Sequence, residues 1–336
     1  MSEPTPAPSA PSTAAGNPAS TPVLDEAPVL AHVVRGGFLE SEHRATVVVT
    51  APDGAPDLVL GVDAPVFPRS ANKPMQGLAM VRAGLDLPDD LLALGCASHS
   101  GEQVHREGVE RILAGAGLGL DALQNTPDLP IDPQEQKAWL QAGRDAERVT
   151  QNCSGKHAAM LATCVANGWD LQTYRDPAHP LQEAMATTLA DLAGEPVMAT
   201  ATDGCGAPVM AITLGGLARA FGRLAAATEG PERRVADAIR RHPEMLGGTR
   251  RDVTALIRGT QGAIAKDGAE AVYAVGLPDG RGVALKVADG GGRARPVVLA
   301  AVLRRLGVES HAYGVLEDAP VLGHGEPVGR VEAVGI

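Results

Sequence analysis

Strand-like segments gather near both ends of this chain, with helical patterns between them, and this order constrains the fold more than any other feature. The segments span residues 28–34, 45–50, 58–63, 271–277, 283–287 and 329–334. Turn sequences join two neighbouring pairs, Ala-Pro-Asp-Gly at 51–54 and Pro-Asp-Gly-Arg-Gly at 278–282. Both turn sequences favour antiparallel hairpins.

Apolar residues at helical spacing recur between and after these strands. They are found at 75–82, 104–113, 157–165, 181–192, 209–221 and 295–306. Neither group of strands could bury a sheet face alone. We therefore expect an α/β (α+β) fold in which one antiparallel sheet is built from N- and C-terminal strands and carries a largely helical insertion. We expect a single domain over residues 26–336.

Composition limits the kinds of protein this chain can be. Hydrophobic residues make up 44% and aromatic residues only 2%, so the core must consist of Ala, Leu and Val. The net charge of −11 argues against nucleic acid or an anionic membrane surface as a partner. No apolar run approaches the length of a membrane span. Residues 1–25 are rich in Pro, Ala, Ser and Thr, which predicts a disordered tail.

Cysteine content and the first residues bear on the cellular compartment. Four cysteines in 336 residues do not suggest a disulfide scaffold. The first residues lack the basic and apolar regions of a secretory signal. We therefore expect a cytoplasmic protein.

Ser70 and Lys73 form the first candidate catalytic pair. At the start of a helix their spacing places both side chains on one face, with about 5–6 Å between Cβ atoms. Pro74 is compatible with a first helical turn. A serine hydroxyl needs a base to become a nucleophile, and a desolvated lysine can serve. This is the S-x-x-K arrangement of serine β-lactamases. The alternative is a capping serine followed by a surface lysine.

Ser98 stands in a second polar loop, Ser98-His99-Ser100-Gly101-Glu102, which opens a helical segment. One interpretation is that Ser98 caps this helix, because a glutamate follows it closely. The other is that Ser98 supplies a second hydroxyl that relays a proton near Ser70.

Cys153, Lys156 and Cys205 are candidate metal ligands. Cys153 and Lys156 are three residues apart at the start of a helical segment, and Cys205 lies in a glycine-rich loop with Asp203. Two cysteines from separate loops, with a third donor, could bind zinc. Lysine is an unusual zinc ligand, so the alternative is a buried cysteine beside a surface lysine. Cys96 and Cys164 fall on apolar patterns and are expected in the core.

Two lysines near the C-terminal strands are further candidates. Lys266-Asp267-Gly268 opens the last strand pair and is similar to the K-T-G element of β-lactamases. Lys286 ends the next strand. Each of the two lysines could instead be a solvated strand residue.

Taken together, these motifs resemble one family. Phe-Pro-Arg-Ser-Ala-Asn-Lys-Pro-Met-Gln at 67–76, Ala-Ser-His-Ser-Gly-Glu at 97–102, Asn-Cys-Ser-Gly-Lys-His at 152–157 and Asp-Gly-Cys-Gly-Ala-Pro at 203–208 occur in this order. The chain resembles the rhizobial-type, inducible and thermolabile L-asparaginases, from about residue 28 onward. The family's fold is similar to that of serine β-lactamases and glutaminases. The Ser-Asp-Asn motif of β-lactamases is missing, and Ser98-His99-Ser100 stands in its place.

The resemblance implies roles for the candidate residues. It implies two Ser-Lys pairs, Ser70 with Lys73 and Ser98 with Lys286, and Lys266 matches the β-lactamase position instead. Which serine forms the acyl-enzyme stays open, and so does the choice between Lys286 and Lys266.

The resemblance also implies a zinc site and a substrate. Zinc would be held by Cys153, Lys156 and Cys205. The substrate, L-asparagine, would contact the residues Arg69, His157, Asp203 and Lys266. Hydrolysis to L-aspartate and ammonia and a homodimer are the corresponding expectations. The alternatives are a glutaminase, a penicillin-recognising serine hydrolase, or a metal-binding scaffold without activity.

Overall fold

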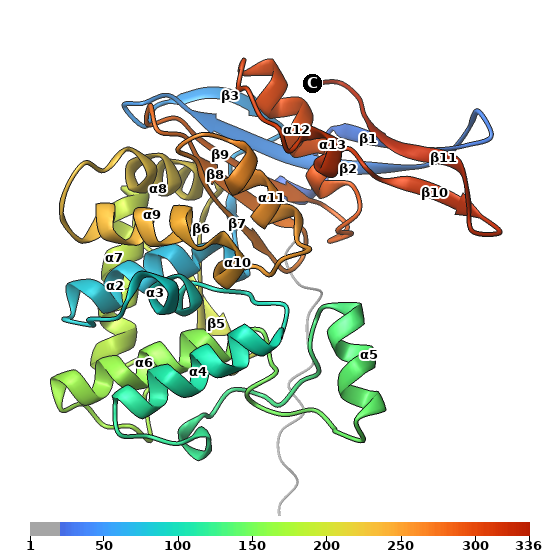
Figure 1. Ribbon diagram of the computed structural model, residues 1–336. Coiled ribbons are helices and arrows are strands. Elements are labelled where there is room, and N and C mark those ends of the chain that lie inside the picture. The colour runs from blue at the N-terminus through green and yellow to red at the C-terminus, as the bar shows by residue number, and fades with distance from the viewer. Residues whose placement is uncertain (1–20) are drawn as a thin grey trace, which may run out of the picture.

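The computed structural model describes residues 21–336, and its strands form one large antiparallel sheet beside a helical layer (Figure 1). The sheet has the strand order β10-β11-β1-β2-β9-β8-β7, and β3 pairs with the end of β2. The N-terminal strands are β1 (Val29–Arg35), β2 (Phe38–Thr50) and β3 (Pro56–Leu60). The C-terminal strands are β7 (Ile264–Gly268), β8 (Val272–Gly276), β9 (Gly282–Val287), β10 (Pro320–Gly323) and β11 (Glu326–Ala333).

Two junctions show how the chain ends combine. β1 lies between β2 and β11, and β2 continues on to pair with β9. Both hairpins expected from the turn sequences are present, with Gly54 and Gly280 at positive φ, where a side chain would be strained. The expected fold class, a sheet built from both ends of the chain, is therefore confirmed.

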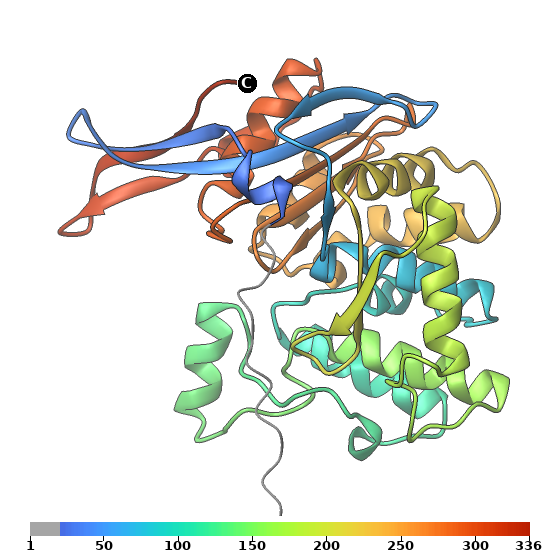
Figure 2. The ribbon, with the colours of Figure 1, turned by 180° about the vertical axis from the view of Figure 1, so that it is seen from behind.

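The helical insertion lies between β3 and β7, on one side of the sheet (Figure 2). It contains η1 (Arg69–Asn72), α2 (Lys73–Arg82), α3 (Asp89–Gly95), α4 (Gln103–Gly115), η2 (Leu120–Ala122), α5 (Pro133–Gln141), α6 (Ser154–Asn167), α7 (Pro180–Ala193), α8 (Leu214–Ala226), α9 (Gly230–Arg241), α10 (Pro243–Leu246) and α11 (Asp252–Gly259). A small second sheet, β4 (Pro65–Val66), β6 (Pro208–Thr213) and β5 (Ala199–Thr202), lies within it.

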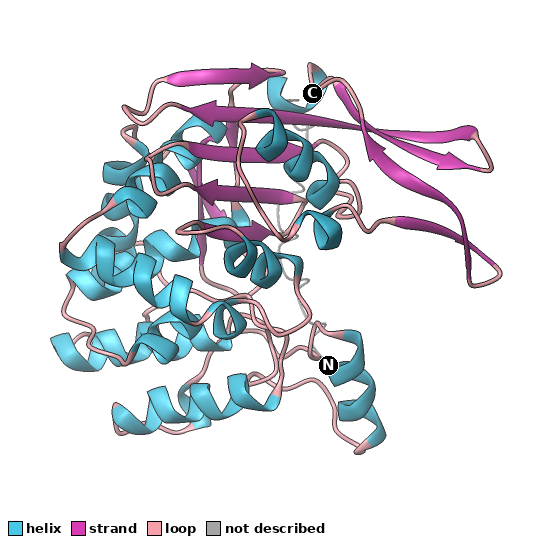
Figure 3. Cartoon of the chain, turned by 45° about the horizontal axis from the view of Figure 1, so that its top comes forward, coloured by secondary structure: helices cyan, strands magenta, loops and turns pink. Residues whose placement is uncertain are grey.

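After the main sheet strands, α12 (Arg295–Arg305) and α13 (Tyr313–Leu316) complete the fold. α12 packs against the sheet from the side opposite the insertion (Figures 1 and 3). In Figure 3 the β1–β2 and β10–β11 hairpins extend beyond the helices. Within residues 21–336, no helix is long and apolar enough to cross a bilayer.

α8 is the helix that joins the sheet to the helical layer. It packs on β2, β8 and β9 on one side and on α7 and α9 on the other. Gly276 and Gly282 are paired across β8 and β9 directly beneath it. A methyl group at Gly282 would overlap the carbonyl oxygen of Ala218, and one at Gly276 would overlap that of Phe221. The helix can approach the sheet this closely because both positions lack side chains.

Two expectations about elements need correction. Residues 209–221 are not one helix, because Val209 lies in β6 and α8 begins only at Leu214. β6 is almost completely buried, so its sequence lacks the alternation that marks a half-buried strand. Lys266 lies within a strand of its own, β7, which the sequence did not separate.

The last five residues of the predicted tail are described by the structure and are not disordered. Residues 1–20 of that tail lie outside the described residues. The segment Pro22–Asp25 is a short helix, α1, with Val23 buried in the core and the Val23 carbonyl bonded by Thr46.

Candidate active site

Ser70 and Lys73 stand where the sequence predicts, at the start of a helix. η1 leads directly into α2, and Pro74 occupies the first turn of α2. Arg69, just before Ser70, has a φ of 52°, a left-handed conformation that is uncommon for a residue with a side chain. Ser70 is half-buried, whereas Lys73 is only 1% exposed. The expectation of a surface lysine at position 73 is therefore excluded.

The Lys73 ammonium contacts the second candidate serine. Its Nζ donates to Ser98 Oγ at 3.0 Å, to the carbonyl of Ala97 at 2.5 Å and to Cys153 Sγ at 3.1 Å. Among the hydrogen bonds of the described residues, none joins Lys73 Nζ to Ser70 Oγ. Lys73 thus connects the Ser98 loop with Cys153 directly behind the Ser70 turn.

The Ser98 loop is fixed by its neighbours, and Ser98 does not cap the following helix. The cap of α4 is Glu102, whose side chain and that of His105 form a reciprocal capping box. His99 Nδ1 accepts from the Gly101 amide, so its Nε2 donates to Ser154 Oγ at 2.8 Å. The hydroxyl of Ser98 is therefore left for Lys73, and the capping interpretation of Ser98 is wrong.

The three candidate metal ligands are neighbours. Lys156 Nζ lies 3.3 Å from Cys205 Sγ, and Cys153 and Cys205 interact directly. Each of the three is at least 96% buried. Gly155 allows this arrangement, because a methyl group there would lie 2.5 Å from the Leu94 carbonyl oxygen and force α6 away from α3.

Electrostatics make Cys205 the thiolate of this cluster. A hydrogen bond from Cys153 and the charge of Lys156 lower the pKa of Cys205 to about 4 against the effect of burial. The same interaction with Cys205, together with burial, raises the pKa of Cys153 to about 12. Burial lowers the pKa of Lys156, but Cys205, Cys153 and Asp203 outweigh it, so that pKa is raised. The cluster therefore contains a thiolate and ammonium pair.

The chemistry of this cluster fits zinc. Two donors on one tetrahedral zinc, a thiolate and an amine, lie about 3.5 Å apart when the metal distances are ordinary. The distance of 3.3 Å between Lys156 Nζ and Cys205 Sγ is close to that value. Among residues 21–336, no group of three or more His, Cys, Asp or Glu side chains could hold a metal, so a site here needs the lysine.

A pocket of about 360 Å³ opens in front of these residues. Its lining residues are Arg69, Ser70, Thr126, Pro127, Asp128, Gln151, Asn152, Cys153, Asp203, Gly204, Cys205 and Ala269. Arg69 Nε donates to Asp203 Oδ1 at 2.7 Å within this pocket. Burial raises the pKa of Asp203, but Lys156 and Arg69 outweigh it and the pKa is lowered. A cation and an anion thus lie side by side next to Ser70.

His157 lies deeper than a substrate contact would. It is fully buried in α6, and its Nδ1 is 2.6 Å from the Tyr174 hydroxyl. Burial and the charge of Lys156 lower the pKa of His157 well below its usual value. His157 does not line the pocket, and it directly follows the candidate metal ligand Lys156 in α6.

Lys266, and not Lys286, is close enough to Lys73 for the two charges to affect each other. Lys266 is fully buried, and its charge and that of Lys73 repel each other. Burial lowers the pKa of Lys266 to about 8. Lys286 Nζ donates to the carbonyls of Glu270 and Val287, at 2.7 and 2.8 Å.

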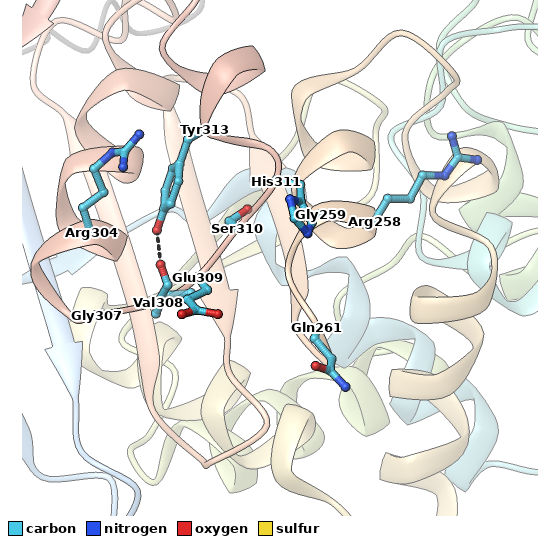
Figure 4. Close-up of a pocket in the computed structure, with 10 residues that line it drawn as sticks. All are labelled: Arg258, Gly259, Gln261, Arg304, Gly307, Val308, Glu309, Ser310, His311 and Tyr313. Carbon is cyan, nitrogen blue, oxygen red and sulfur yellow. Dashed lines mark hydrogen bonds between the residues drawn. The ribbon is translucent and has the colours of Figure 1, made fainter.

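The candidate site does not lie in the larger of the cavities described here. A larger cavity, of about 810 Å³, lies near the C-terminal ends of α11 and α12 (Figure 4). Figure 4 shows the Tyr313 hydroxyl bonded to the Val308 carbonyl there, at 2.5 Å. None of the sequence-predicted site residues lines this cavity.

The small number of lysines in the sequence is a signal that could have identified more of the site residues than the motifs did. The chain has only five lysines among its 29 lysine and arginine residues. Three of them, Lys73, Lys156 and Lys266, are at most 2% exposed, although lysine is almost never fully buried without a partner. In a chain that otherwise uses arginine, each lysine is therefore a candidate functional residue. Asp267, which binds Lys266, and Arg251, which binds Asp267, had no comparable signal in the sequence.

The sequence matches one known protein family over most of its length. Residues 31–333 match the sequence pattern of the family described as L-asparaginase II. No curated protein sequence matches the chain. Similar solved structures include Mglu in its glutamate form, with 14% identity, a TM-score of 0.41, and coverage of 83% of this chain and 63% of that one. The chain thus spans less than two thirds of Mglu.

Two other similar structures are covered almost completely. A β-lactamase from Mycobacterium bovis has 14% identity and a TM-score of 0.39, over 78% of this chain and 94% of that one. EstCE1, a hydrolase with promiscuous acyltransferase activity, has 11% identity and a TM-score of 0.39, over 82% and 94%.

The family match covers nearly all of the described residues, including both serine loops and all three candidate metal ligands. The described residues form a mixed α/β fold. The chain belongs to the L-asparaginase II family, which confirms the resemblance inferred from its motifs.

Proposed function

We propose that this protein is an L-asparaginase that hydrolyses L-asparagine to L-aspartate and ammonia through a Ser-Lys centre. The observation that carries the proposal is the buried hydrogen bond of 3.0 Å between Lys73 Nζ and Ser98 Oγ, directly behind the pocket that Ser70 lines. A buried lysine that contacts one serine and lies one helical turn after another can move protons during acyl transfer.

The proposed reaction has two halves. Ser70 Oγ attacks the side-chain amide carbon of asparagine, and Lys73 takes the hydroxyl proton. Backbone N–H groups at the η1 turn stabilise the negative oxygen of the tetrahedral intermediate. Ammonia leaves with a proton delivered through Ser98, and water then hydrolyses the Ser70 ester to release aspartate. Ser98, which already contacts Lys73, is the alternative nucleophile.

Arg69 and Asp203 are the proposed anchors of the substrate. Asparagine carries an α-carboxylate and an α-ammonium, and both must be paired when they leave water. The Arg69–Asp203 ion pair lines the pocket beside Ser70 and offers a partner for each charge. Substrate binding would exchange one ion pair for two.

We propose Lys266 as the second lysine of the centre. It is fully buried and feels the charge of Lys73, whereas the Lys286 ammonium donates to two carbonyl groups. His157, which directly follows Lys156, supports the metal ligands rather than the substrate.

Zinc is proposed as the cofactor, held by Cys153, Lys156 and Cys205. When bound, it would supply positive charge beside the pocket. Cys205 already provides the thiolate, and Lys156 would have to lose its proton to bind. Cys153 would link the metal to the reaction centre, because its sulfur also contacts Lys73.

The homodimer and the cytoplasmic location remain predictions. Light scattering after size-exclusion chromatography would measure the first, and fractionation of the native cells the second.

One panel of assays tests the proposed function. Purified protein is given asparagine, glutamine and nitrocefin, and ammonia release or β-lactam cleavage is measured. We expect the wild-type protein to hydrolyse asparagine, and we expect Ser70→Ala and Lys73→Ala each to abolish this activity. Because the two residues act together, the double variant should lose little more than either single one.

A control and a contrary outcome complete this test. Ser100→Ala alters a serine of the same loop as Ser98, but its hydroxyl bonds the Gly247 carbonyl, so activity should persist. If Ser70→Ala kept most of its kcat while Ser98→Ala lost it, Ser98 would be the nucleophile. Preferred glutamine or nitrocefin turnover would contradict the asparaginase assignment.

A further inference from the structure

A buried ionic network lies behind the proposed catalytic lysines. Its centre is Asp267, which is 5% exposed at the end of β7. Lys266 Nζ donates to Asp267 Oδ1 and to the Asp267 carbonyl, both at 2.7 Å. Arg251 Nη2 donates to Asp267 Oδ2 at 2.5 Å, and Arg295 Nη1 lies 3.5 Å from the same oxygen.

The contact between Lys266 and Asp267 is unusual for neighbours in a strand. Successive side chains of a strand point to opposite faces, so adjacent residues do not normally meet. Here the Lys266 side chain bends back to the carboxylate of the next residue, and both of its hydrogen bonds go to that residue. Asp267 therefore determines where the Lys266 ammonium lies.

The same network reaches both candidate serine loops. Arg251 Nη1 donates to the Ser98 carbonyl at 3.4 Å, while its Nη2 holds Asp267. Gly268, directly after Asp267, packs against the Ser70 turn, because a methyl group there would lie 2.5 Å from the Pro68 carbonyl oxygen. One carboxylate thus links the second lysine to the Ser98 loop through a single arginine, and it sits beside the turn that carries Ser70.

We propose that Asp267, held by Arg251, is a positioning residue that fixes the Lys266 ammonium at the buried end of the reaction centre. This inference rests on the proposed function, because it assigns Lys266 a part in the same reaction. Asp267 does not line the pocket, so its effect on the reaction passes through Lys266.

The charge of Asp267 also sets the proton affinity of Lys266. The groups that face Lys266 are Asp267 on its own strand, Lys73 from α2, Arg251 before α11 and Cys96 after α3. Burial lowers the pKa of Lys266 and Asp267 opposes that effect, leaving the pKa at about 8. Removing the carboxylate must therefore lower the pKa of Lys266 further.

The first experiment compares pH profiles of kcat/KM for asparagine. Asp267→Asn should lower kcat/KM about 10²-fold, since the lysine loses its fixed position. The alkaline limb of the profile should shift to lower pH by roughly one unit, because the protonated form of Lys266 loses a neighbouring anion and the pKa of Lys266 falls. Asp267→Glu, which keeps the carboxylate, should restore the limb. Asp252→Asn is the matched control, because Asp252 binds Arg295 at 3.1 Å and does not contact Lys266.

The second experiment does not depend on turnover. With five lysines in the chain, 13Cε-labelled lysine gives few enough NMR signals to follow each titration, and Lys266→Arg identifies the Lys266 signal. Lys266 should titrate near pH 8 in the wild type and at lower pH in Asp267→Asn. If Asp267→Asn does not fold, the double variant Asp267→Asn/Arg251→Gln removes an anion and a cation together and should shift Lys266 in the same direction.

The outcomes separate this inference from the proposed function. Wild-type protein that does not hydrolyse asparagine would overturn the proposed function, while the NMR titration still decides the role of Asp267. If the wild type is active and folded Asp267→Asn keeps both its alkaline limb and its Lys266 titration, the positioning role is wrong.

Discussion

At the scale of single residues, this molecule concentrates unusual side-chain environments in one place. Three of its five lysines are buried, and their ammonium groups contact serine, cysteine and aspartate side chains of the candidate site. Burying an ammonium group without a partner costs several kcal/mol. Such costs are tolerated at functional sites, where a perturbed proton affinity has a use.

Asp203 gives the first prediction at this scale. Asp203→Ala removes the proposed partner of the substrate ammonium and should lower kcat/KM for asparagine about 10²-fold, mainly by raising KM. Glutamine places its amide one methylene further from anchored α-groups, and a misplacement of about 1 Å can cost 10²-fold in rate. The measurement is kcat/KM for asparagine, glutamine and an amide without the α-amino group.

A control for Asp203 is available on the surface. Asp279→Ala removes an aspartate that binds Arg281 far along the chain, and activity should not change. Equal kcat/KM values for the three amides in the wild type would show that the α-groups are not recognised.

Zinc binding gives the second prediction, with a defined dependence on pH. Cys205 is already a thiolate near neutral pH, whereas Cys153 and Lys156 carry protons that zinc must displace. Two protons are therefore released, and the affinity should fall about 100-fold for each unit by which the pH drops around neutrality. Titration with a competing chelator at several pH values measures this slope.

The zinc prediction has its own control. Cys164→Ala alters a buried cysteine on the apolar side of α6 and should bind zinc as the wild type does. Protein purified without chelator should contain about one zinc per chain. Elemental analysis that finds none, with the fold intact, would contradict the site.

At the scale of elements, the contact between α8 and the sheet depends on glycine. Gly282→Ala should destabilise the protein by about 1–3 kcal/mol, because the new methyl group overlaps the Ala218 carbonyl and forces helix and sheet apart. Gly115→Ala is the matched control, since Gly115 ends α4 with open space around it. That variant should be neutral or more stable by at most about 1 kcal/mol. Denaturant unfolding measures both, and equal stability of the two variants would exclude the close contact.

The same elements show what the sequence could predict. Hairpins such as β8–β9 were predictable, because Pro, Asp and Gly fix the turn locally. The Ser70 turn was predictable for the same reason, since Pro74 favours a first helical turn. β6 was not, because a strand buried on both faces has no alternation to separate it from a helix.

Contacts between distant segments were also beyond the sequence. The motif spacing paired Ser70 with Lys73, but the hydrogen bond of Lys73 goes to Ser98, 25 residues away. Arg251 and Asp267 meet only because α11 packs against β7. The resemblance to a family placed both serine loops in one site. It could not decide whether Lys266 or Lys286 is the second catalytic lysine, because that depends on the positions of β7 and β9 in the sheet.

At the scale of the whole molecule, the sheet and the helical layer share one core. The buried apolar residues of both layers form a single contiguous cluster. The chain enters the helical layer after β3 and returns to the sheet only at β7, so the sheet is built from two separate segments of the chain. Opening either layer would expose a face of α8, which packs against both.

This arrangement predicts one cooperative unfolding transition over residues 26–336. Both tryptophans, Trp139 in α5 and Trp169 after α6, lie in the helical insertion, so their fluorescence reports that layer alone. Far-UV circular dichroism reports both layers, and hydrogen exchange can follow the amides of β8 and β9 separately. Because the layers share α8, the fluorescence and dichroism transitions should coincide in denaturant, and the amides of β9 and α6 should open with the same free energy. Sheet amides that open at lower denaturant than the tryptophan transition would instead show that the sheet and the insertion are two folding units.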